Sequence, residues 1–276
     1  MTRSVADAAL LYAAMSGRDD GDEATAAAPA DGPAGDVVAL GDGALRGARL
    51  GVARAFFTGF DEVDALIEKA IVELQRLGAV IVDPVDLALP SYSDAELRVL
   101  LCELKADLPK YLASFAAEAK VKTLADVIAF NRAHREREMP WFGQELFERA
   151  EAYGGLESKE YLDSLADCRK GARDDGLDRV FAAHRLDALI APTGGPAWLI
   201  DPVNGDHSGA SFSSPAAVAG YPHLTVPAGL VRGLPIGLSF VGPAWSEARL
   251  LAYGDAYEQA TKARRAPAFA KRTTPL

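Results

Sequence analysis

Cysteine, basic residues and long apolar runs are all scarce in this 276-residue sequence, and each scarcity excludes a class of protein. The two cysteines, Cys102 and Cys168, lie far apart and in no CxxC or Cys/His pattern, so neither a disulfide framework nor a zinc site is indicated. A reducing, cytoplasmic setting is therefore expected. No apolar run approaches the roughly 18 residues of a membrane span. The first residues, with Arg3 and Asp7, lack the features of a signal peptide, so we expect a soluble chain that is not exported and has no membrane partner.

Basic residues are outnumbered by acidic ones. Lys and Arg total 29 against 39 Asp and Glu, which gives a formal net charge of −10. Binding to nucleic-acid phosphates requires a basic face, so this balance argues against a nucleic-acid partner. The 49% of hydrophobic residues and 25% of charged residues are typical of a soluble globular protein with a substantial core.

Short apolar strands alternate with amphipathic helices, a pattern that predicts an α/β fold. The clearest unit is strand 48–53, helix 61–77 and strand 79–82, which indicates a right-handed parallel crossover with Gly78 as the helix stop. A helix is also expected at the start of the chain. The remaining predicted helices are 93–108, ended or kinked by Pro109, then 123–136, 141–152, 158–184, 215–219 and 246–261, and the remaining strands are 187–191, 223–226 and 236–241, with a turn at Gly229–Gly233.

Several motifs contain residue types that are found in catalytic, cofactor or metal sites, but their sequence context favours ordinary structural or solvent-exposed roles. Gly41, Gly43 and Gly47 form a glycine string that enters a strand rather than a helix, which disfavours a dinucleotide site. The triplet Asp206–His207–Ser208 has the residue types of a hydrolytic triad, yet adjacent side chains diverge too far to act together. His134, Glu136 and Glu138 are spread over two faces of a helix, so a solvated face is favoured over a metal site.

Two further groups of residues each allow two interpretations. Ser213 and Ser214 precede Pro215 at the start of a short helix, where a serine is more often a cap than a nucleophile. The basic residues near the C-terminus could bind an anion, although solvation of the tail and of a helix end is favoured. These basic residues are Lys262, Arg264, Arg265, Lys271 and Arg272. The most distinctive feature is the Gly-, Pro- and Ser-rich segment 192–215 after a buried strand, which is typical of a pocket wall.

Four segments together resemble the C-terminal portion of an amidase-signature hydrolase: MTRSVADAALL at 1–11, DALIAPT at 187–193, TVPAG at 225–229 and GLPIGLSFVG at 233–242. The linking segment GGPAWLIDPVNGDHSGASFSSPAAVAGYP at 194–222 is similar to the peptide-amidase-like branch. The resemblance implies a single α/β domain with a mixed, twisted sheet covered by helices. It also implies hydrolysis of a carboxamide to a carboxylate and ammonia by a Ser–cis-Ser–Lys triad, with no metal or other cofactor.

The triad itself has no counterpart that we can assign in this sequence. In the family, the lysine and the GSSGGS-type serine segment precede the helix that matches MTRSVADAA, and neither is found here. Residues 1–276 are therefore expected to form a single incomplete domain, inactive alone, with no catalytic residue. The resemblance assigns pocket-lining roles to Thr193, Asn204, Asp206 and Ser213, with ordinary loop polarity as the alternative.

Two hypotheses of function follow. In the first, the chain is part of an amidase for a small-molecule or peptide amide, and a separate polypeptide or an upstream segment supplies the triad. In the second, it is a non-catalytic binding or assembly domain that keeps the amidase scaffold. The DNA immediately upstream of Met1 distinguishes them, because an in-frame GSSGGS-type segment there means that the start is misplaced.

Overall fold

The computed structural model describes residues 1–29, 40–41, 43–87, 89–115, 118–207, 209–267 and 269. These residues form two compact units. The larger unit comprises Met1–Ala88 and Ala172–Leu276, and the smaller comprises Leu89–Gly171. Whether they act as the single domain expected from the sequence stays a prediction.

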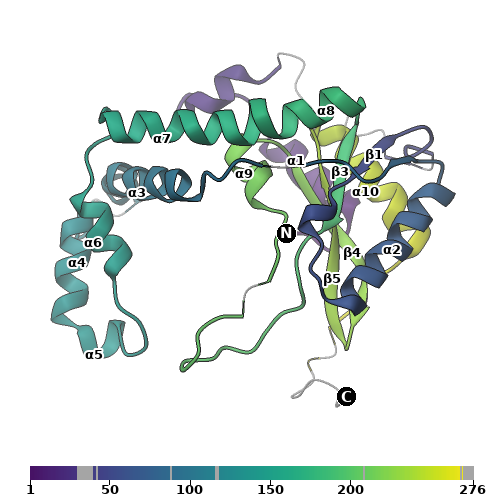
Figure 1. The fold of residues 1–276 in the computed structure, drawn as a ribbon. Helices are drawn as coiled ribbons and strands as arrows, with labels where there is room; N and C mark the ends of the chain where they lie inside the picture. Colours follow the sequence, from purple (N-terminus) through teal and green to yellow (C-terminus); the bar gives the residue numbers. More distant parts are fainter. Residues whose placement is uncertain are drawn as a thin grey trace. The chain divides into compact units, whose positions relative to one another are not determined.

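The larger unit is built on a five-stranded mixed sheet with the order β2-β1-β3-β5-β4 (Figure 1). Strand β1 (Arg49–Val52) pairs in parallel with β2 (Val80–Val82) on one side and with β3 (Ala188–Pro192) on the other. Strand β5 (Leu234–Val241) then runs antiparallel to both β3 and β4 (His223–Val231). The α/β prediction and the mixed sheet are confirmed.

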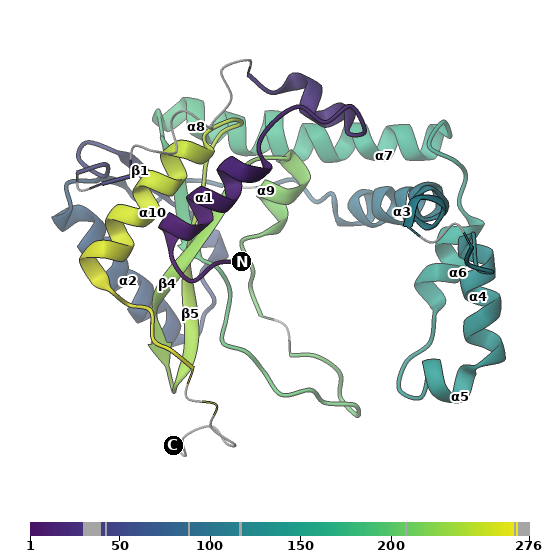
Figure 2. The same ribbon diagram turned by 180° about the vertical axis from the view of Figure 1, so that it is seen from behind.

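One face of this sheet is covered by α2 (Asp61–Arg76) and α10 (Glu247–Thr261), and α1 (Val5–Met15) packs on α10 (Figures 1 and 2). Helix α2 turns an apolar stripe towards the strands because its buried residues recur three or four positions apart. They are Val63, Ile67, Ala70, Ile71 and Leu74. Together with alternate side chains of the strands, these helices enclose the main hydrophobic core of the unit.

The strands predicted at 223–226 and 236–241 form the β-hairpin of β4 and β5. Leu224 is opposite Phe240 and Val226 is opposite Leu238, so the alternating apolar side chains share one face. The predicted turn was too long, because only Arg232 and Gly233 form it, both with positive φ (50° and 81°). This geometry is that of a two-residue turn whose twist matches the strands.

The remaining elements of the larger unit are short. Helix α8 (Asp178–His184) precedes β3, and α9 (Ser214–Ala219) precedes β4. Two 3-10 helices span Glu23–Ala27 and Arg54–Phe56. A π-helical stretch, Lys170–Leu177, lies between α7 and α8, and Gly176 within it has non-helical backbone angles (φ −101°, ψ −107°). The single helix predicted at 158–184 is therefore interrupted by a kink there.

The smaller unit is helical, as predicted. Its helices are α3 (Ser93–Phe115), α4 (Leu124–Ala133), α5 (Arg135–Glu138), α6 (Glu145–Ala152) and α7 (Lys159–Arg169). Leu101, Leu124, Ile128 and Ala150 form its buried cluster. Of the two alternatives for Pro109, that it ends or kinks the helix, the first is wrong, since α3 continues through Pro109 to Phe115.

The sheet ends in two edge strands, β2 and β4, and this corrects one expectation about exposed edges. The short apolar strands at 79–82, 187–191 and 236–241 are those that the sequence predicts to be at risk of an unpaired edge. The first is the edge strand β2, but β3 and β5 have a partner on both sides. Of the two actual edges, β4 contains Pro227, which lacks an N–H, and an irregular register between Pro227 and Gly229. Strand β2 has neither feature, and Val80 is 44% exposed.

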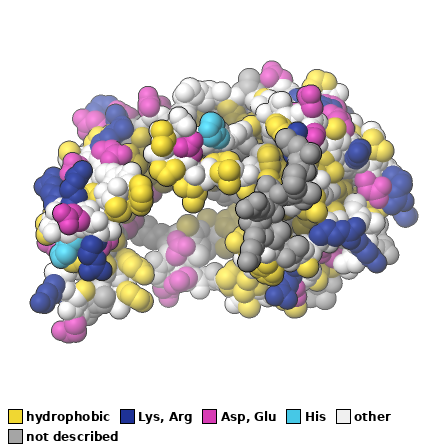
Figure 3. Space-filling view, turned by 90° about the horizontal axis from the view of Figure 1, so that it is seen from below, with side chains coloured by type: hydrophobic (Ala, Val, Ile, Leu, Met, Phe, Trp, Pro, Cys, Tyr) yellow, Lys and Arg dark blue, Asp and Glu magenta, His cyan; other side chains and the backbone are white. Residues whose placement is uncertain are grey.

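We expect the purified chain to self-associate and to bind the hydrophobic dye ANS. There are two reasons. Strand β2 is an edge without a proline or an irregular register, and large apolar side chains lie at the surface, where hydrophobic side chains are drawn in yellow in Figure 3. Leu199, Ile200 and Val203 are 85%, 90% and 88% exposed. Light scattering and dye fluorescence provide the measurement, and a Val80→Lys variant should reduce association. A monodisperse 29.2 kDa monomer without dye binding would contradict this prediction.

Candidate functional site

The long segment after β3 begins and ends at the same place on the sheet. Thr193 follows the strand, and its backbone N–H donates to the carbonyl of Gly237 in β5 over 2.8 Å. The N–H of Phe212 donates to the carbonyl of Thr193 over 3.2 Å, and Gly194 and Ser211 form an isolated antiparallel bridge. The loop 194–211 is therefore closed at its base.

Beside this base, four polar side chains form a continuous line across β3, β5 and β4. The Thr193 hydroxyl lies 2.6 Å from that of Thr225 and 2.8 Å from that of Ser239, and Ser239 Oγ lies 2.6 Å from His223 Nε2. Ser239 is fully buried, Thr193 and His223 are half-buried, and Thr225 is exposed. Gly237 provides the space, because a Cβ there would lie 2.5 Å from Thr225 Oγ1 and 2.6 Å from Thr193 Oγ1. We refer to Thr225, Thr193, Ser239 and His223 as the polar chain.

The imidazole at the inner end of the polar chain is neutral near pH 7. Burial lowers the pKa of His223 below its ordinary value of 6.5, because desolvation disfavours the imidazolium. The fully buried Phe212 ring lies edge-on to it, with 6.2 Å between ring centroids. A neutral histidine offers one donor and one acceptor nitrogen, which suits it to a hydroxyl partner.

This pKa makes the stability of the fold depend on pH. Because the pKa is lower in the folded state, the unfolded chain takes up a proton first as the pH falls below about 6.5, and the folded state loses stability. We expect the unfolding free energy to fall between pH 7.5 and roughly pH 5.5 by less in His223→Gln than in the unmodified chain. Denaturant titrations at each pH measure this, with exposed His207→Gln as the control. Parallel pH profiles for the chain and the His223 variant would contradict it.

The structure brings one of the four predicted pocket residues, Thr193, into the polar chain. Ser213 lies at the start of α9 but does not cap it through its side chain. Its hydroxyl instead lies 3.1 Å from that of Ser211, and Ser213 is exposed. The sequence favours Ser213 as a helix cap, but its hydroxyl does not cap α9.

Asn204 and Asp206 lie in the loop 194–211, where they help to fix its shape. Asp201 accepts hydrogen bonds from the N–H groups of Val203 and Asn204 (2.9 and 3.0 Å) and from the Asn204 side chain (2.8 Å). These bonds, led by the one from the Asn204 backbone, lower the pKa of Asp201. Asp206 accepts from the indole of Trp198 across the loop (3.1 Å). Both predicted residues are exposed, and their described hydrogen bonds stay within the loop.

Sequence reasoning missed Thr225, Ser239 and His223. A signal was present, because each alternates along its strand with an apolar residue of the core, such as Leu238 and Phe240. Polar groups at alternate positions of two paired strands share the face opposite the core. The sequence did not show that Thr193 lies on the same side, because that depends on β3 being the neighbour of β5.

Other candidate motifs lead to no second site in the part of the chain that the structure describes. Within it, no group of three or more His, Cys, Asp or Glu is arranged to hold a metal, and no helix is long and apolar enough to cross a membrane. His134 Nδ1 bonds the carbonyl of Phe130. Of the triplet at 206–208, Ser208 is outside the described residues, as are Lys271 and Arg272 of the C-terminal basic group.

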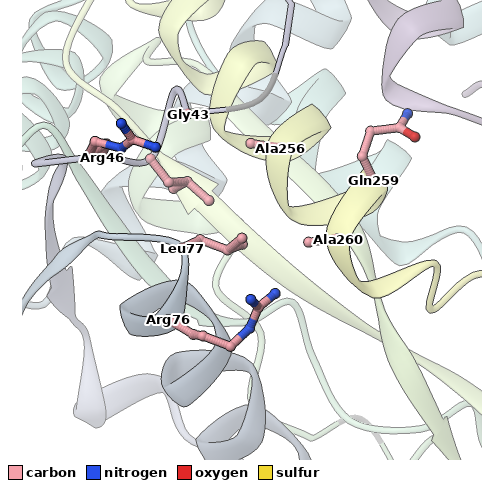
Figure 4. A pocket seen from close by; sticks show the side chains of 8 residues that line it. Gly43, Arg46, Arg76, Leu77, Ala256, Gln259 and Ala260 are labelled. Atoms are coloured by element: carbon pink, nitrogen blue, oxygen red, sulfur yellow. The ribbon is translucent and has the colours of Figure 1, made fainter.

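The glycine string at residues 41–47 does border a cavity of about 290 Å³ (Figure 4). Gly43 and Gly47 have positive φ and turn the chain into β1 rather than into a helix, as the sequence predicts. Arg76, which also lines the cavity, is already paired with Glu73 at 2.6 Å. The described lining contains no Ser, Cys, His, Asp or Glu, so this cavity has neither a nucleophile nor a general base.

Comparison with known proteins identifies the family. A family model described as Amidase matches residues 1–251. The chain belongs to the amidase family. Among solved structures, this amidase-family chain is similar to the peptide amidase of Stenotrophomonas maltophilia, with 46% identity and a TM-score of 0.88. The match covers 98% of this chain and 54% of that one. An amidase family protein of Bacillus anthracis gives 30% identity and a TM-score of 0.75, over 97% and 49% of the two chains. The mixed sheet with its helices thus matches the amidase-signature fold.

Curated relatives agree. The chain is 33% identical to a probable amidase of Arabidopsis thaliana, over 97% of this chain and 49% of that protein. It is 35% identical to one of the subunits of the glutamyl-tRNA(Gln) amidotransferase of Myxococcus xanthus, over 100% of this chain and 56% of that protein. The amidase-family chain therefore spans about half the length of the curated relatives it matches.

Proposed function

We propose that this chain supplies part of the substrate pocket of an amide hydrolase whose nucleophile and base lie on another stretch of polypeptide. One observation carries the proposal. The chain is 46% identical to a peptide amidase over nearly all of its own length, yet covers 54% of that protein and contains no GSSGGS-type segment. The reaction would be hydrolysis of a carboxamide C–N bond to a carboxylate and ammonia through a Ser–cis-Ser–Lys triad.

In this proposal the loop 194–211 and the polar chain form one wall of the pocket. Thr193, Asn204, Asp206 and Ser213 line it, and the substrate is a small-molecule or peptide amide. Hydroxyl and amide groups suit this role because an uncharged carboxamide is recognised through its carbonyl and N–H groups. The free, buried thiols of Cys102 and Cys168 support a reducing location such as the cytoplasm as part of the proposal.

The test is complementation by a second polypeptide. The chain is co-expressed with the part of a peptide-amidase chain that it does not match, and ammonia release from a C-terminally amidated dipeptide is measured. We expect the two polypeptides to co-purify and to release ammonia, and the activity to disappear when the serines of the partner's GSSGGS-type segment are replaced by alanine. Failure to co-purify would overturn the proposal.

A second candidate function is assembly without chemistry. The similarity to a protein that is one of the subunits of an amidotransferase favours it, since such a chain works beside others. In the same experiment, stable co-purification without ammonia release would support this function and overturn the first.

A further inference from the structure

Helix α1 carries apolar side chains on every side. Between Val5 and Met15, Asp7 is its one charged residue. Val5 and Ala9 are buried and join the main core beside α10, on which α1 packs (Figure 2). A helix that is apolar all round is typical of a buried position, whereas a surface helix has one polar face. The sequence of α1 is therefore that of a helix covered on more than one side.

The structure leaves the outer side of α1 open. Leu10 is 72% exposed, Leu11 45% and Met15 69%, and Ala14 is exposed as well. Positions 10 and 14, like positions 11 and 15, are four residues apart and are neighbours on the helix, so the four side chains form a continuous apolar surface. We refer to Leu10, Leu11, Ala14 and Met15 as the α1 face. Such a patch on a protein surface is typical of an interface.

A cavity of about 180 Å³ lies beside α1, between that helix, the start of β4 and α10. Ala8 and Tyr12 line it from α1, and Leu250 and Leu251 line it from α10. Among the described residues of the lining, Glu247 is the one with a carboxylate. Burial, and after it the negative charge of Glu247, raise the pKa of Tyr12 above its ordinary value of 10.0. The carboxylate thus lies close to α1.

The Glu247 carboxylate lacks one partner. Its Oε2 atom is buried and has no hydrogen bond in the described structure. A carboxylate only accepts hydrogen bonds, and a buried one is stabilised best by a cationic donor, which also offsets its charge. Lysine and arginine are the side chains that supply such a donor at neutral pH. The cavity beside α1 gives space for a side chain that comes from outside this chain.

We propose that the α1 face and Glu247 together form the docking surface for a second polypeptide, which lays apolar side chains on α1 and places a lysine or arginine on Glu247 Oε2. The share of each chain in the comparison points to this occupant. The match covers 98% of this chain but 54% of the peptide amidase, so that protein has a further stretch of nearly the same length. The identity of the occupant rests on the proposed function, whereas the open face and the unpaired oxygen are features of the chain itself.

A triple glutamine variant, Leu10→Gln with Leu11→Gln and Met15→Gln, tests the α1 face. Glutamine has nearly the helix propensity of leucine and methionine, so the circular dichroism of the chain should be unchanged. We expect the tagged variant, co-expressed with the unmatched part of a peptide-amidase chain, to recover about tenfold less of that polypeptide than the unmodified chain does. The matched control replaces three other exposed helical residues by glutamine and should recover the normal amount. They are Val72, Leu146 and Leu162.

Glu247→Gln separates docking from support of the fold. In the chain alone, the change removes a negative charge at a buried, unpaired oxygen, so the denaturation midpoint should stay the same or rise. In the co-expressed pair, it removes the acceptor of the cation, so recovery of the second polypeptide should fall about tenfold. A residue that only supported the fold would lower both quantities. Asp61→Asn removes an exposed acid from the first turn of α2 and should leave the recovery unchanged.

The possible results decide the docking surface and the proposed function separately. Normal recovery by the triple variant would overturn docking on α1, and if that variant were also monomeric where the unmodified chain associates, a second copy of this chain would be the occupant. Normal recovery by Glu247→Gln would overturn the cation on Oε2. Co-purification without ammonia release that is lost in the triple variant would support the docking surface and count against hydrolysis alone. If the unmodified chain recovers no second polypeptide, both proposals fail.

Discussion

The 276-residue chain alone is expected to release no ammonia from amidated peptides above the rate of an assay without protein. A serine hydroxyl is a weak nucleophile until a base takes its proton, and an amide also requires stabilisation of the oxyanion that forms. Loss of nucleophile and base together typically lowers kcat by about a millionfold. In an ammonia assay with a long incubation, we therefore expect the chain to give the same signal as the assay without protein.

The serines of the chain provide the controls for this prediction. Ser239 lies 2.6 Å from a histidine nitrogen, the geometry of an activated nucleophile, but it is fully buried and no substrate can reach it. Ser213 is exposed, and its hydroxyl partner is Ser211 rather than a base. Ammonia release that disappears in Ser213→Ala or Ser214→Ala would contradict the prediction and place the nucleophile at the start of α9.

Truncation of Phe240 to alanine is expected to lower the unfolding free energy by about 3–5 kcal/mol, because the change leaves a cavity in a packed core. Phe240 is 0% exposed and is opposite Ile190 in β3 and Leu224 in β4, so its ring lies where three strands meet the covering helices. The measurement is a chemical-denaturation series at constant pH.

A matched substitution makes this result interpretable. Phe142 is 73% exposed in the smaller unit, and Phe142→Ala should change the unfolding free energy by less than about 0.5 kcal/mol. A loss below about 1 kcal/mol for Phe240→Ala would show that the ring is not part of the core.

Local elements could be predicted because their signals lie within a few residues. The unit of β1, α2 and β2 follows from an apolar stripe between two short apolar runs, with Gly78 at φ 98° where the helix stops. Pro109 does not end α3 because a proline removes one N–H from a helix but does not prevent a long helix with tertiary contacts from continuing.

The site was harder to predict because it depends on sheet order. Thr193 and Thr225 lie 32 positions apart, and they meet only because β5 lies between β3 and β4. The same order shows why β3 and β5 are not edges. The resemblance assigns pocket-lining roles to Asn204 and Asp206, and these roles stay a prediction. In the described structure their side chains hold the loop together through Asp201 and Trp198.

Because the loop 194–211 is closed at its base, it can be exchanged as a unit. Since Gly194 and Ser211 are adjacent, the residues between them can be lengthened, shortened or exchanged without changing the distance that the chain must span on the sheet. Under the proposed function, selectivity for different amides would diverge by loop replacement while the strands beneath stay as they are. Grafting loops between relatives is a direct way to engineer that selectivity.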